Sequence, residues 1–548
     1  MTELSTPAAE APARPSAPRR ALRWITDRPR AELYAWLVLI ALAFLLRIVD
    51  LGSRPFHHDE SQDAYFSWVF YDRGDYQYQP ILHGPLRFYL TASMYALFGD
   101  SDFTARLAPA LMGTVLVGLP YLIRRQIGRI AAFVAGLLLA FGPSYLYFSR
   151  FAREDIYIAC ITMGLYVALF RFLDRPRAGG PAIMAALIAL SFATKETTFI
   201  SGFVLFTFLV VMVVWQRLQA GNWRDGEIVR AVRSVGWAPW AYALAVFWIV
   251  FALLFTVFFT NPDGLRAGIV DGLDYWLNQQ PENRGGEPWY FYIAVLFGEE
   301  WPVLLLGGVG MVWTARHPTT QRLFLIWAFF VSLAIYSWAS ERFSWLVLHP
   351  LLPLILLAGV GVQALWVGRT RRMRIVAGLV IAACFAYTGV ASYLANARFG
   401  ANPRDWLVST QSSVDVKRVV DRVADIEARV KARTGQDLTI TVDSGQGATF
   451  PYAWYFRHKK VGYIDMTTPN YVPDTQVLVM TEAARAKLLP SLAAYDGQRF
   501  RFREWWVRDW SKKFSPGAWW DWFTQRKTWN PPGGMPEWLY VRKDAEAA

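Results

Sequence analysis

The sequence predicts a polytopic α-helical membrane protein of about eleven transmembrane helices, followed by a C-terminal extracytoplasmic α/β domain. Three observations predict this fold class: an apolar composition, a series of long apolar spans, and basic residues in every second gap between them. Of the 548 residues, 54% are hydrophobic and 18% are charged, whereas soluble domains carry roughly 25% charged residues. Such a composition excludes a string of soluble domains and a largely disordered chain. The two cysteines lie inside apolar runs, which excludes a disulfide scaffold.

Residues 1–32 are rich in alanine, proline and arginine, and we expect them to form a disordered, basic cytoplasmic tail. The apolar span at 33–49 follows directly, and we interpret it as a retained helix because no small-residue cleavage site follows it. Further runs approach the roughly 20 residues that a membrane-crossing helix needs: 104–123, 130–148, 156–173, 181–194, 199–215, 239–260, 290–314, 322–339, 345–366 and 375–394. The run at 181–194 is short, so we expect its membrane part to extend to about residue 200.

The orientation follows from the distribution of arginine and lysine among the short gaps. The basic gaps are the N-terminal tail, 124–129, 171–177, 217–233, 316–322 and 369–374. They occupy every second gap, so we place them in the cytoplasm of a cell with a plasma (inner) membrane. The outside then receives the residues after about 395 and the gaps at 50–103, 149–155, 195–198, 261–289 and 340–344. The formal net charge of +13 therefore indicates membrane topology rather than a nucleic-acid partner.

The chain from 396 to 548 differs from the transmembrane domain at 33–395. Residues 417–433 have the pattern of an amphipathic helix, 438–443 and 476–480 that of buried strands, and 482–494 that of a second helix. This alternation predicts a small α/β domain, which has no glycine-rich nucleotide motif. Its tail holds eight tryptophans, which suit a membrane interface and core packing, or stacking on sugar rings. We prefer the interface and core packing.

The outer loop at 50–103 contains the densest group of ionisable residues. His57, His58, Asp59, Glu60 and Asp63 follow shortly after an apolar helix. One of these carboxylates can act as a general base for a hydroxyl nucleophile, which contributes about 10²–10⁴-fold in rate. The same residues can also bind a divalent metal or form a solvated loop. We favour catalysis, and we expect no required cofactor or metal.

Two further outward segments supply polar residues. His83 stands in a turn rich in proline and glycine, where it orients a carboxylate, contacts a phosphate or caps the turn. Arg150 and Arg153 carry planar guanidinium groups suited to phosphate, and for Arg150 a snorkelling or positional role at the interface is the alternative. Asp155 begins a helix, so helix capping is the alternative to a role in the site.

Charged residues also stand at the ends of later spans. Lys195 and its neighbour Glu196 neutralise each other, or Lys195 faces an anionic ligand. Arg284 precedes two glycines, which allow a phosphate to approach closely. Arg342 precedes, and His349 lies just inside, an apolar span that contains two prolines. That pattern indicates a cavity rather than a lipid-facing wall.

Together these residues predict an outward-facing cavity with carboxylates from one loop and cations from several others. The set suits a reaction in which a hydroxyl attacks and a phosphate leaves. Nucleotide sugars are not supplied outside the cytoplasm, so a lipid-linked sugar phosphate is the expected donor. The predicted catalytic residues are Asp59, Glu60 and Asp155. The predicted substrate-binding residues are His58, His83, Arg150, Arg153, Lys195, Arg284, Arg342 and His349.

The order of these motifs resembles that of the GT-C glycosyltransferases, in the branch around the dolichyl-phosphate-mannose protein mannosyltransferases and the lipid A aminoarabinose transferase. The resemblance covers about residues 1–400 and rests on Asp59-Glu60, His83-Gly84-Pro85-Leu86, Ser149-Arg150 through Asp155, and Lys195-Glu196. It implies an inverting transfer from a polyprenyl-phosphate sugar to an extracytoplasmic hydroxyl on a protein, lipid or glycan of the cell envelope. It also implies that Asp59 is the general base, that Asp155 helps to shape the site, and that the leaving phosphate is held by Arg150, Arg153, Lys195 and Arg342.

A bacterial and archaeal subgroup resembles the chain further, through Arg284-Gly285-Gly286 and through Trp345, His349-Pro350 and Pro353. The chain departs from that subgroup at Arg342 and Ser344, where the subgroup has lysine and proline. Some members are described as accessory to moving lipid-linked sugars across the membrane. The alternative function is therefore a non-catalytic protein that binds or helps to translocate such lipids. An ion-coupled transporter is disfavoured, because the charges lie at one interface and no internal repeat is evident.

Overall fold

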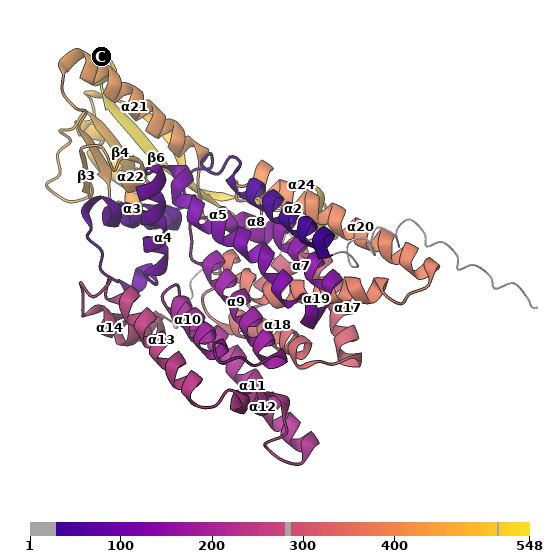
Figure 1. Ribbon diagram of the computed structural model, residues 1–548. Coiled ribbons are helices and arrows are strands. Elements are labelled where there is room, and N and C mark those ends of the chain that lie inside the picture. The colour runs from indigo at the N-terminus through magenta and orange to yellow at the C-terminus, as the bar shows by residue number, and fades with distance from the viewer. Residues whose placement is uncertain (1–28, 280–285, 512–514, 548) are drawn as a thin grey trace, which may run out of the picture.

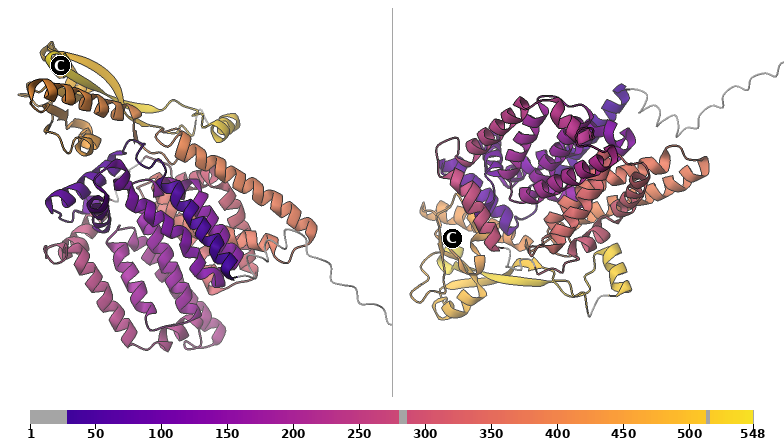
Figure 2. Two further views of the ribbon diagram at one scale, coloured as in Figure 1. Left: turned by 45° about the horizontal axis from the view of Figure 1, so that its top comes forward. Right: turned by 90° about the horizontal axis from the view of Figure 1, so that it is seen from below.

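The computed structural model describes residues 29–279, 286–511 and 515–547. Its helices form a bundle, and a sheet domain from the C-terminal part of the chain covers one end of that bundle, above α3 and α4 (Figure 1). In both further views the sheet domain lies at the edge of the helical bundle, at the top in the left view and at the bottom in the right view (Figure 2). The predicted tail, up to residue 28, and Arg284 lie outside the described residues.

The described part of the chain contains eight helical spans that are long and apolar enough to cross a membrane, or up to ten if two bent helix pairs each count as one. The single spans are α2 (Pro29–Ile48), α5 (Asp102–Gly118) with η2 (Leu119–Ile123) and α6 (Arg124–Ile127), α9 (Asp155–Asp174), α11 (Thr198–Ala220), α13 (Ala238–Phe255), α18 (Thr320–Trp338), η4 (Ser344–Val347) with α19 (Leu348–Trp366), and α20 (Arg371–Tyr393) with η5 (Leu394–Arg398). Each predicted span coincides with one of these helices, with a bent pair or with the shorter α10. The protein is therefore a multi-pass membrane protein, as predicted.

The two bent pairs break where the sequence weakens the helix. The pair α7 (Arg129–Phe141) and α8 (Pro143–Ser149) bends by 57°, and the pair α16 (Phe291–Glu299) and α17 (Trp301–Arg316) bends by 101°. Pro143 and Pro302 each lie at the start of the second helix. Proline has no N–H to continue the hydrogen-bond ladder, so these positions are natural helix starts and breaks.

One expected extension is wrong. Helix α10 (Gly180–Phe192) is 13 residues long and does not continue to residue 200. Backbone N–H groups of the 83–86 turn donate to the carbonyl oxygens of Ala193 and Thr194, so the chain there is held in a non-helical conformation by another segment. The following helix, α11, starts at Thr198. The break places Lys195, which is buried, and Glu196 between the two helices.

Contacts between loops sort the gaps into two sets, as the charge distribution predicts. At one end of the bundle Glu32 pairs with Arg124 at 3.1 Å, and Arg322 donates to the carbonyl oxygen of Ile127 at 3.4 Å. Thr320 donates to Glu227, in the short helix α12 (Glu227–Ser234), at the same set of predicted gaps. The gaps of the other set, which are predicted to face outward, meet at the opposite end of the bundle. Which set faces the cytoplasm stays a prediction.

The core of the bundle surrounds α19. Its span is fully buried, with α7, α17 and α18 packed around it. Small residues permit these close approaches: a side chain at Gly359 would collide with the backbone of Ala131 in α7, and one at Gly310 would collide with the backbone of Leu357. Such small-residue contacts are typical of packed membrane helices.

The outer loop and the 261–279 segment are largely helical. The loop contains α3 (His58–Arg73), η1 (Pro80–Leu82) and α4 (Leu86–Phe98). The 261–279 segment contains α14 (Gly264–Arg266), the π-helical turn η3 (Ala267–Asp271) and α15 (Gly272–Gln279). These elements lie at the end of the bundle that the sheet domain covers (Figure 1).

The C-terminal domain is a mixed α/β domain, as predicted. Its sheet has the order β1-β5-β6-β4-β2-β3, in which β2 runs parallel to β3 and β4 and the other pairs are antiparallel. The elements are β1 (Gln411–Ser412), α21 (Val414–Thr434), β2 (Ile440–Asp443), η6 (Gly445–Gly447), α22 (Thr449–Tyr455), β3 (Val461–Ile464), β4 (Val477–Thr481), α23 (Glu482–Leu488), η7 (Leu489–Ser491), β5 (Tyr495–Trp505), α24 (Pro516–Gln525), β6 (Gly533–Arg542) and α25 (Lys543–Glu546). The predicted helix at 482–494 is shorter than expected, because Pro490 lies in the 3₁₀ turn that follows α23.

Aromatic residues join this domain to the bundle. Trp454 of α22 donates to the carboxylate of Asp102, at the start of α5, with a distance of 2.8 Å. Trp522 of α24 is fully buried and stacks on Trp406, with ring centroids 4.4 Å apart. Trp520 on the same helix is 64% exposed. At least part of the tryptophan-rich tail therefore serves core packing, in line with the preferred interpretation.

Candidate active site

The outer loop turns into α3 at His57, and this turn sets the directions of two adjacent carboxylates. His57 Nδ1 accepts a hydrogen bond from the backbone N–H of Asp59 at 3.1 Å. Glu60 Oε2 accepts one from the backbone N–H of His57 at 3.0 Å. The two bonds form a capping box at the start of α3. Neighbouring side chains on a helix point about 100° apart, so Asp59 and Glu60 face different surroundings.

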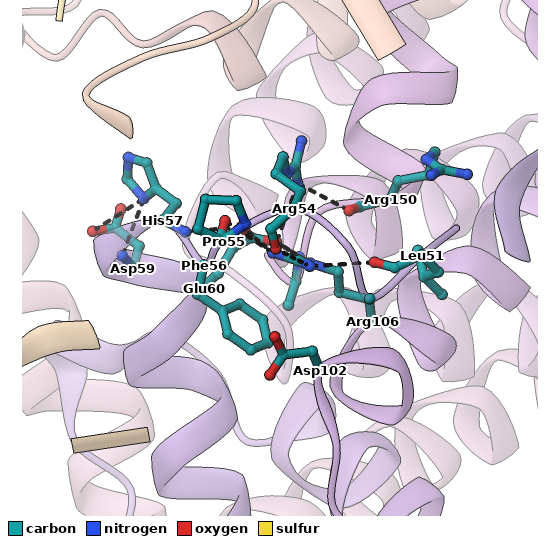
Figure 3. Close-up of polar contacts among 12 residues, drawn as sticks. Leu51, Arg54, Pro55, Phe56, His57, Asp59, Glu60, Asp102, Arg106 and Arg150 are labelled. Atoms are coloured by element: carbon teal, nitrogen blue, oxygen red, sulfur yellow. Dashed lines mark hydrogen bonds and ion pairs between the residues drawn. The ribbon is translucent and has the colours of Figure 1, made fainter. Parts of the chain in front are cut away.

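Glu60 faces the bundle and is fully buried. Arg106 of α5 donates to both carboxylate oxygens, from Nε at 2.8 Å and from Nη2 at 3.0 Å (Figure 3). The backbone N–H of Ala152 donates to Glu60 Oε1 at 2.9 Å. Burial raises the pKa of Glu60, but Arg106 and Arg54 outweigh burial and lower that pKa to about 2. These contacts hold the outer loop against α5 and the 149–155 gap. Glu60 is therefore a positioning residue.

Asp59 lies on the other side of the turn from Arg106 (Figure 3) and forms an ion pair with Arg153 Nη1. The exposed fraction of its side chain is 29%, against 0% for Glu60 and Glu154 and 1% for Asp155. Burial raises the pKa of the Asp59 carboxyl, whereas Arg153 lowers it, and the net result is a pKa of about 2. Asp59 is therefore an ionised carboxylate that a substrate can reach.

The Arg-Glu-Asp segment before α9 brings Glu154 to the centre of a buried ion network. Glu154 accepts hydrogen bonds from Arg153 and from Arg87, each at 2.9 Å. Its carboxylate also lies 3.0 Å from Lys195 Nζ and 3.2 Å from His83 Nε2. Burial raises the pKa of Glu154, but Arg153 and Lys195, with smaller contributions from His83 and Arg87, outweigh burial and hold that pKa well below its ordinary value. Residues from the outer loop, the 149–155 gap and the 193–197 break thus meet at one carboxylate.

Sequence reasoning did not place Glu154, Arg87 or Arg106 among the site residues. Arg87 pairs with Glu154 and with Asp63, and Arg106 holds Glu60. Each arginine stands alone within an otherwise apolar run. An isolated ionisable residue in such a run indicates a polar partner in the folded protein, so this signal was present in the sequence.

Lys195 lies in the break between α10 and α11 and reaches the start of α9. Its Nζ donates to Asp155 Oδ1 at 2.9 Å and lies 3.0 Å from Glu154 Oε1. His349 Nε2 lies 3.7 Å from the same oxygen of Asp155, and the imidazole stacks on Tyr336 with ring centroids 4.9 Å apart. Asp155 therefore holds the predicted residues Lys195 and His349 together, whether or not it also caps its helix.

His83 and the glycine that follows it dock onto the 193–197 break. His83 Nδ1 lies 2.7 Å from Glu196 Oε2. The backbone N–H of Gly84 donates to the carbonyl oxygen of Thr194 at 3.1 Å. A side chain at Gly84 would collide with the carbonyl group of Ala193, so this approach requires glycine. The turn therefore orients carboxylates, one of the roles predicted for His83.

A cavity of about 220 Å³ adjoins this network. Its polar lining includes His83, Lys195, Glu196, Thr197 and Glu341, and Leu273 and Leu277 of α15 belong to its apolar wall. A pocket with charged groups at one side and aliphatic walls at another suits an amphiphilic ligand with an anionic head group.

Four predicted residues lie elsewhere. His58 accepts a hydrogen bond of 2.7 Å from Arg503 of β5, in the C-terminal domain. Arg150 donates to backbone carbonyl oxygens at the end of α2, at distances from 2.7 to 3.3 Å. Arg342 donates to two backbone carbonyl oxygens, and Arg284 lies outside the described residues. Their substrate-binding roles stay predictions.

Within the described ranges, no group of three or more His, Cys, Asp or Glu side chains is placed to hold a metal ion. The carboxylates of the network instead face cations: Asp59 faces Arg153, Asp63 faces Arg87, Asp155 faces Lys195, and Glu154 faces all three of these cations. The expectation that the site requires no metal stays a prediction.

Comparison with known protein families gives one match. The family model described as dolichyl-phosphate-mannose-protein mannosyltransferase matches residues 82–225. That range contains His83, Arg153 to Asp155 and Lys195, and therefore most of the network, but it does not contain Asp59.

Comparison with curated proteins gives distant relatives. Undecaprenyl phosphate-alpha-4-amino-4-deoxy-L-arabinose arabinosyl transferase 1 of Pseudomonas fluorescens (strain Pf0-1) is 25% identical over 290 residues, which cover 50% of this chain and 46% of that protein. The protein of the same name from strain ATCC BAA-477 is 26% identical over 314 residues, which cover 54% of this chain and 53% of that protein. The chain thus spans about half the length of the curated relatives it matches.

Solved structures match over nearly the whole chain. ArnT from Cupriavidus metallidurans in the apo state has a TM-score of 0.61 at 15% identity and covers 94% of this chain and 99% of that one. The same protein bound to undecaprenyl phosphate has a TM-score of 0.60 at 15% identity, covering 93% and 98%. The Archaeoglobus fulgidus oligosaccharyltransferase has a TM-score of 0.56 at 12% identity, covering 83% and 70%. These findings confirm the predicted resemblance: the chain has the membrane fold of the GT-C glycosyltransferases and is similar to their aminoarabinose transferase branch.

Proposed function

We propose that the protein is a membrane glycosyltransferase that moves a sugar from a polyprenyl-phosphate donor to a hydroxyl group of an extracytoplasmic acceptor, with inversion at the anomeric carbon. One observation carries the proposal. A solvent-accessible carboxylate, Asp59, belongs to the same ion network as Lys195, which lines a partly apolar cavity. A base and a phosphate-binding cation thus lie within one connected site. The fold likeness to ArnT, including its complex with undecaprenyl phosphate, supports this assignment.

The donor fits the cavity between the 193–197 break and α15. Its phosphate would lie against Lys195 and His83, and its prenyl chain along Leu273 and Leu277. Asp155 would act by holding Lys195 in place rather than by touching the sugar. Cations fixed in this way stabilise the charge that develops on a departing phosphate, and such preorganised electrostatics is often the largest contribution to catalysis.

The reaction requires a single displacement. The acceptor hydroxyl oxygen forms a bond to the anomeric carbon while its proton passes to the Asp59 carboxylate. The bond between that carbon and the phosphate oxygen breaks, and its electron pair leaves on the polyprenyl phosphate. The low pKa keeps Asp59 ionised at neutral pH but makes it a weak base. The negative charge of a donor phosphate bound near the same ion network would raise the pKa, and therefore the basicity, of Asp59 when the donor is in place.

We place this site on the extracytoplasmic side of a plasma (inner) membrane, with the N-terminus in the cytoplasm. The placement rests on the basic gaps at the opposite end of the bundle. The acceptor is a protein, lipid or glycan that approaches Asp59 below the C-terminal domain. Arg503 of that domain, which contacts His58 next to Asp59, lies where an acceptor would pass.

The alternative, a non-catalytic protein that binds or translocates polyprenyl-phosphate sugars, is less favoured. The curated relatives are named as transferases. A carrier would also have no need of an accessible carboxylate beside its phosphate-binding cations.

The deciding experiment is a turnover assay on purified protein and its Asp59→Asn variant. Both would be incubated with a panel of polyprenyl-phosphate sugars, with crude envelope as the source of acceptor. We expect wild type to release polyprenyl phosphate and the variant to release it about 10²–10⁴-fold more slowly. Full activity of the variant would exclude Asp59 as the base. Tight lipid binding without release by either protein, with acceptor shown to be present by a second envelope fraction, would favour the accessory function.

A further inference from the structure

A second, larger cavity lies at the opposite end of the bundle from the candidate active site. Its volume is about 590 Å³, and it lies between the α6 region, the end of α9 and the start of α10. Leu122, Val167, Phe172 and Ile183 contribute apolar lining. The neighbouring contact between Glu32 and Arg124 places this cavity among the gaps of the basic set.

The rim of this cavity is strongly basic. Arginines from the α6 segment and from the loop between α9 and α10 line it: Arg124, Arg125, Arg171, Arg175 and Arg177. Asp174 is the acidic residue in the lining, and it is already engaged by Gln126 at 3.2 Å and by Arg175 at 3.9 Å.

Three of these cations carry no carboxylate partner. Within the residues that the structure describes, no ion pair is seen for Arg125, Arg171 or Arg177, and all three side chains are exposed. Like charges held close together at one cavity are unfavourable unless an anion binds between them. The cavity therefore has charge that an anionic ligand would neutralise.

The start of α10 adds to this positive field. No side chain caps the helix at Gly179, and Pro181 stands in its first turn. The Gly180 N–H already donates to the carbonyl oxygen of Arg177 and Pro181 has no N–H, so the contribution of this terminus is the partial positive charge of the helix dipole, which attracts anions. Here that terminus and the arginine side chains border the same cavity.

We propose that this cavity binds an anionic glycerophospholipid of the bilayer. Its phosphate lies among Arg125, Arg171 and Arg177, and an acyl chain lies along the apolar lining. A small soluble anion would leave that apolar lining unused. A zwitterionic lipid would bring an ammonium group next to the arginines. An anionic phospholipid is the ligand that matches both the positive charge of the arginines and the apolar lining of the cavity.

The position of the lipid links it to the rest of the molecule. Helices α9 and α10 form a hairpin whose connecting loop borders the cavity. The far end of α9 carries Asp155, and Lys195 follows the far end of α10. A lipid that bridges the loop and the α6 segment would therefore hold this hairpin against the α6 segment, and bound lipid should stabilise the folded protein.

The test measures lipid retention by native mass spectrometry on the detergent-purified full chain, titrated with phosphatidylglycerol or with phosphatidylcholine of the same acyl chains. One variant is Arg125→Gln/Arg171→Gln/Arg177→Gln. Its matched control is Arg371→Gln/Arg372→Gln/Arg374→Gln, which removes equal charge from another gap of the basic set. With roughly 1 kcal/mol for each arginine near an anionic lipid, the cavity variant should bind phosphatidylglycerol about 100-fold more weakly. Wild type and the control should bind it equally, and phosphatidylcholine should bind weakly to all three.

Several results would overturn the proposal. Unchanged phosphatidylglycerol affinity in the cavity variant would do so, as would equal binding of phosphatidylcholine by wild type. An equal loss in the control variant would show diffuse surface charge instead of a site. A second variant, Ala168→Trp, keeps every charge and fills the cavity. It should also weaken binding, and full affinity would exclude the acyl-chain position. If the triple variant aggregates, Arg171→Gln alone should lower affinity about 5-fold, and no change would count against the site.

Discussion

The ammonium group of Lys195 donates a hydrogen bond of 2.9 Å to Asp155 and lies 3.0 Å from Glu154, so a short break in the chain after α10 neutralises two buried carboxylates at the start of α9. Removing the cation by Lys195→Met would leave both carboxylates buried with less positive charge. We expect a loss of about 3–5 kcal/mol in stability and a fall of about 10²–10³-fold in turnover. Thermal unfolding followed by tryptophan fluorescence, and release of polyprenyl phosphate, measure the two effects.

A double variant separates the structural from the catalytic role of Lys195. Lys195→Met combined with Asp155→Asn removes one positive and one negative charge, so most of the lost stability should return. Turnover should stay low, because no cation faces the leaving phosphate at this position. Recovery of turnover together with stability would show that Lys195 serves only to neutralise Asp155.

Arg150 was predicted to bind substrate, but its hydrogen bonds point to a different role. Its guanidinium group donates to the carbonyl oxygens of Leu46 and Val49, each at 2.7 Å, and of Asp50 at 3.1 Å. These carbonyl groups lie at the end of α2, where helix carbonyls lack backbone N–H partners and a cation is favourable. Arg150→Ala should therefore lower stability by about 1–2 kcal/mol and leave the KM for the donor unchanged. The measurement is the thermal midpoint beside steady-state kinetics.

Arg153→Ala is the matched comparison for this variant. Arg153 contacts Asp59 and Glu154 directly, so its removal should reduce turnover. If Arg150→Ala instead raised the donor KM tenfold with no loss of stability, the predicted substrate-binding role of Arg150 would stand.

The sequence predicts the fold of this protein more completely than it predicts the contacts within the site. Hydropathy and the alternation of basic gaps predict the helices, because crossing a membrane places strong demands on composition. Short motifs place Asp59, His83, Asp155, Lys195 and His349 on one side of the membrane, and the structure brings all five to one end of the bundle, close to a single ion network.

What the sequence does not predict is which neighbouring charge faces which partner. Asp59 and Glu60 are adjacent, yet one contacts Arg153 at an accessible surface and the other is enclosed by Arg106. That difference depends on how α5 packs beside α3, which is a tertiary contact without a local signal. The same holds for Arg150, whose partners are carbonyl groups about a hundred residues away in the chain.

Protonation of Glu60 should govern stability in acid. Its pKa is about 2 in the folded protein and 4.5 ordinarily, so the folded state binds fewer protons than the unfolded state between these values. The stabilisation is fully present above pH 4.5 and is lost as the pH falls toward 2, with a total of about 3 kcal/mol. We expect the thermal midpoint of wild type to fall steeply below pH 4.5.

The Glu60→Gln variant should be less stable than wild type at pH 7 and should lose less stability on acidification. Asp72→Asn, which removes an exposed carboxylate from the same helix, is the control and should follow wild type at every pH. If the thermal midpoints of wild type and Glu60→Gln fell in parallel as the pH is lowered, the ion pair between Glu60 and Arg106 would not be the cause of the loss of stability in acid.

Chelation of divalent metals should not stop the reaction. Arg153, Arg87 and Lys195 already neutralise the carboxylates around Glu154, so the network has little need of a further cation. Lys195 and His83 line the cavity in which we propose that the donor phosphate binds. After incubation with EDTA and desalting, turnover should stay within about twofold of the untreated protein, since no cation of the site is removed. Loss of activity that Mg²⁺, Mn²⁺ or Zn²⁺ restores would show instead that a metal supplies part of the charge assigned here to Lys195 and Arg153.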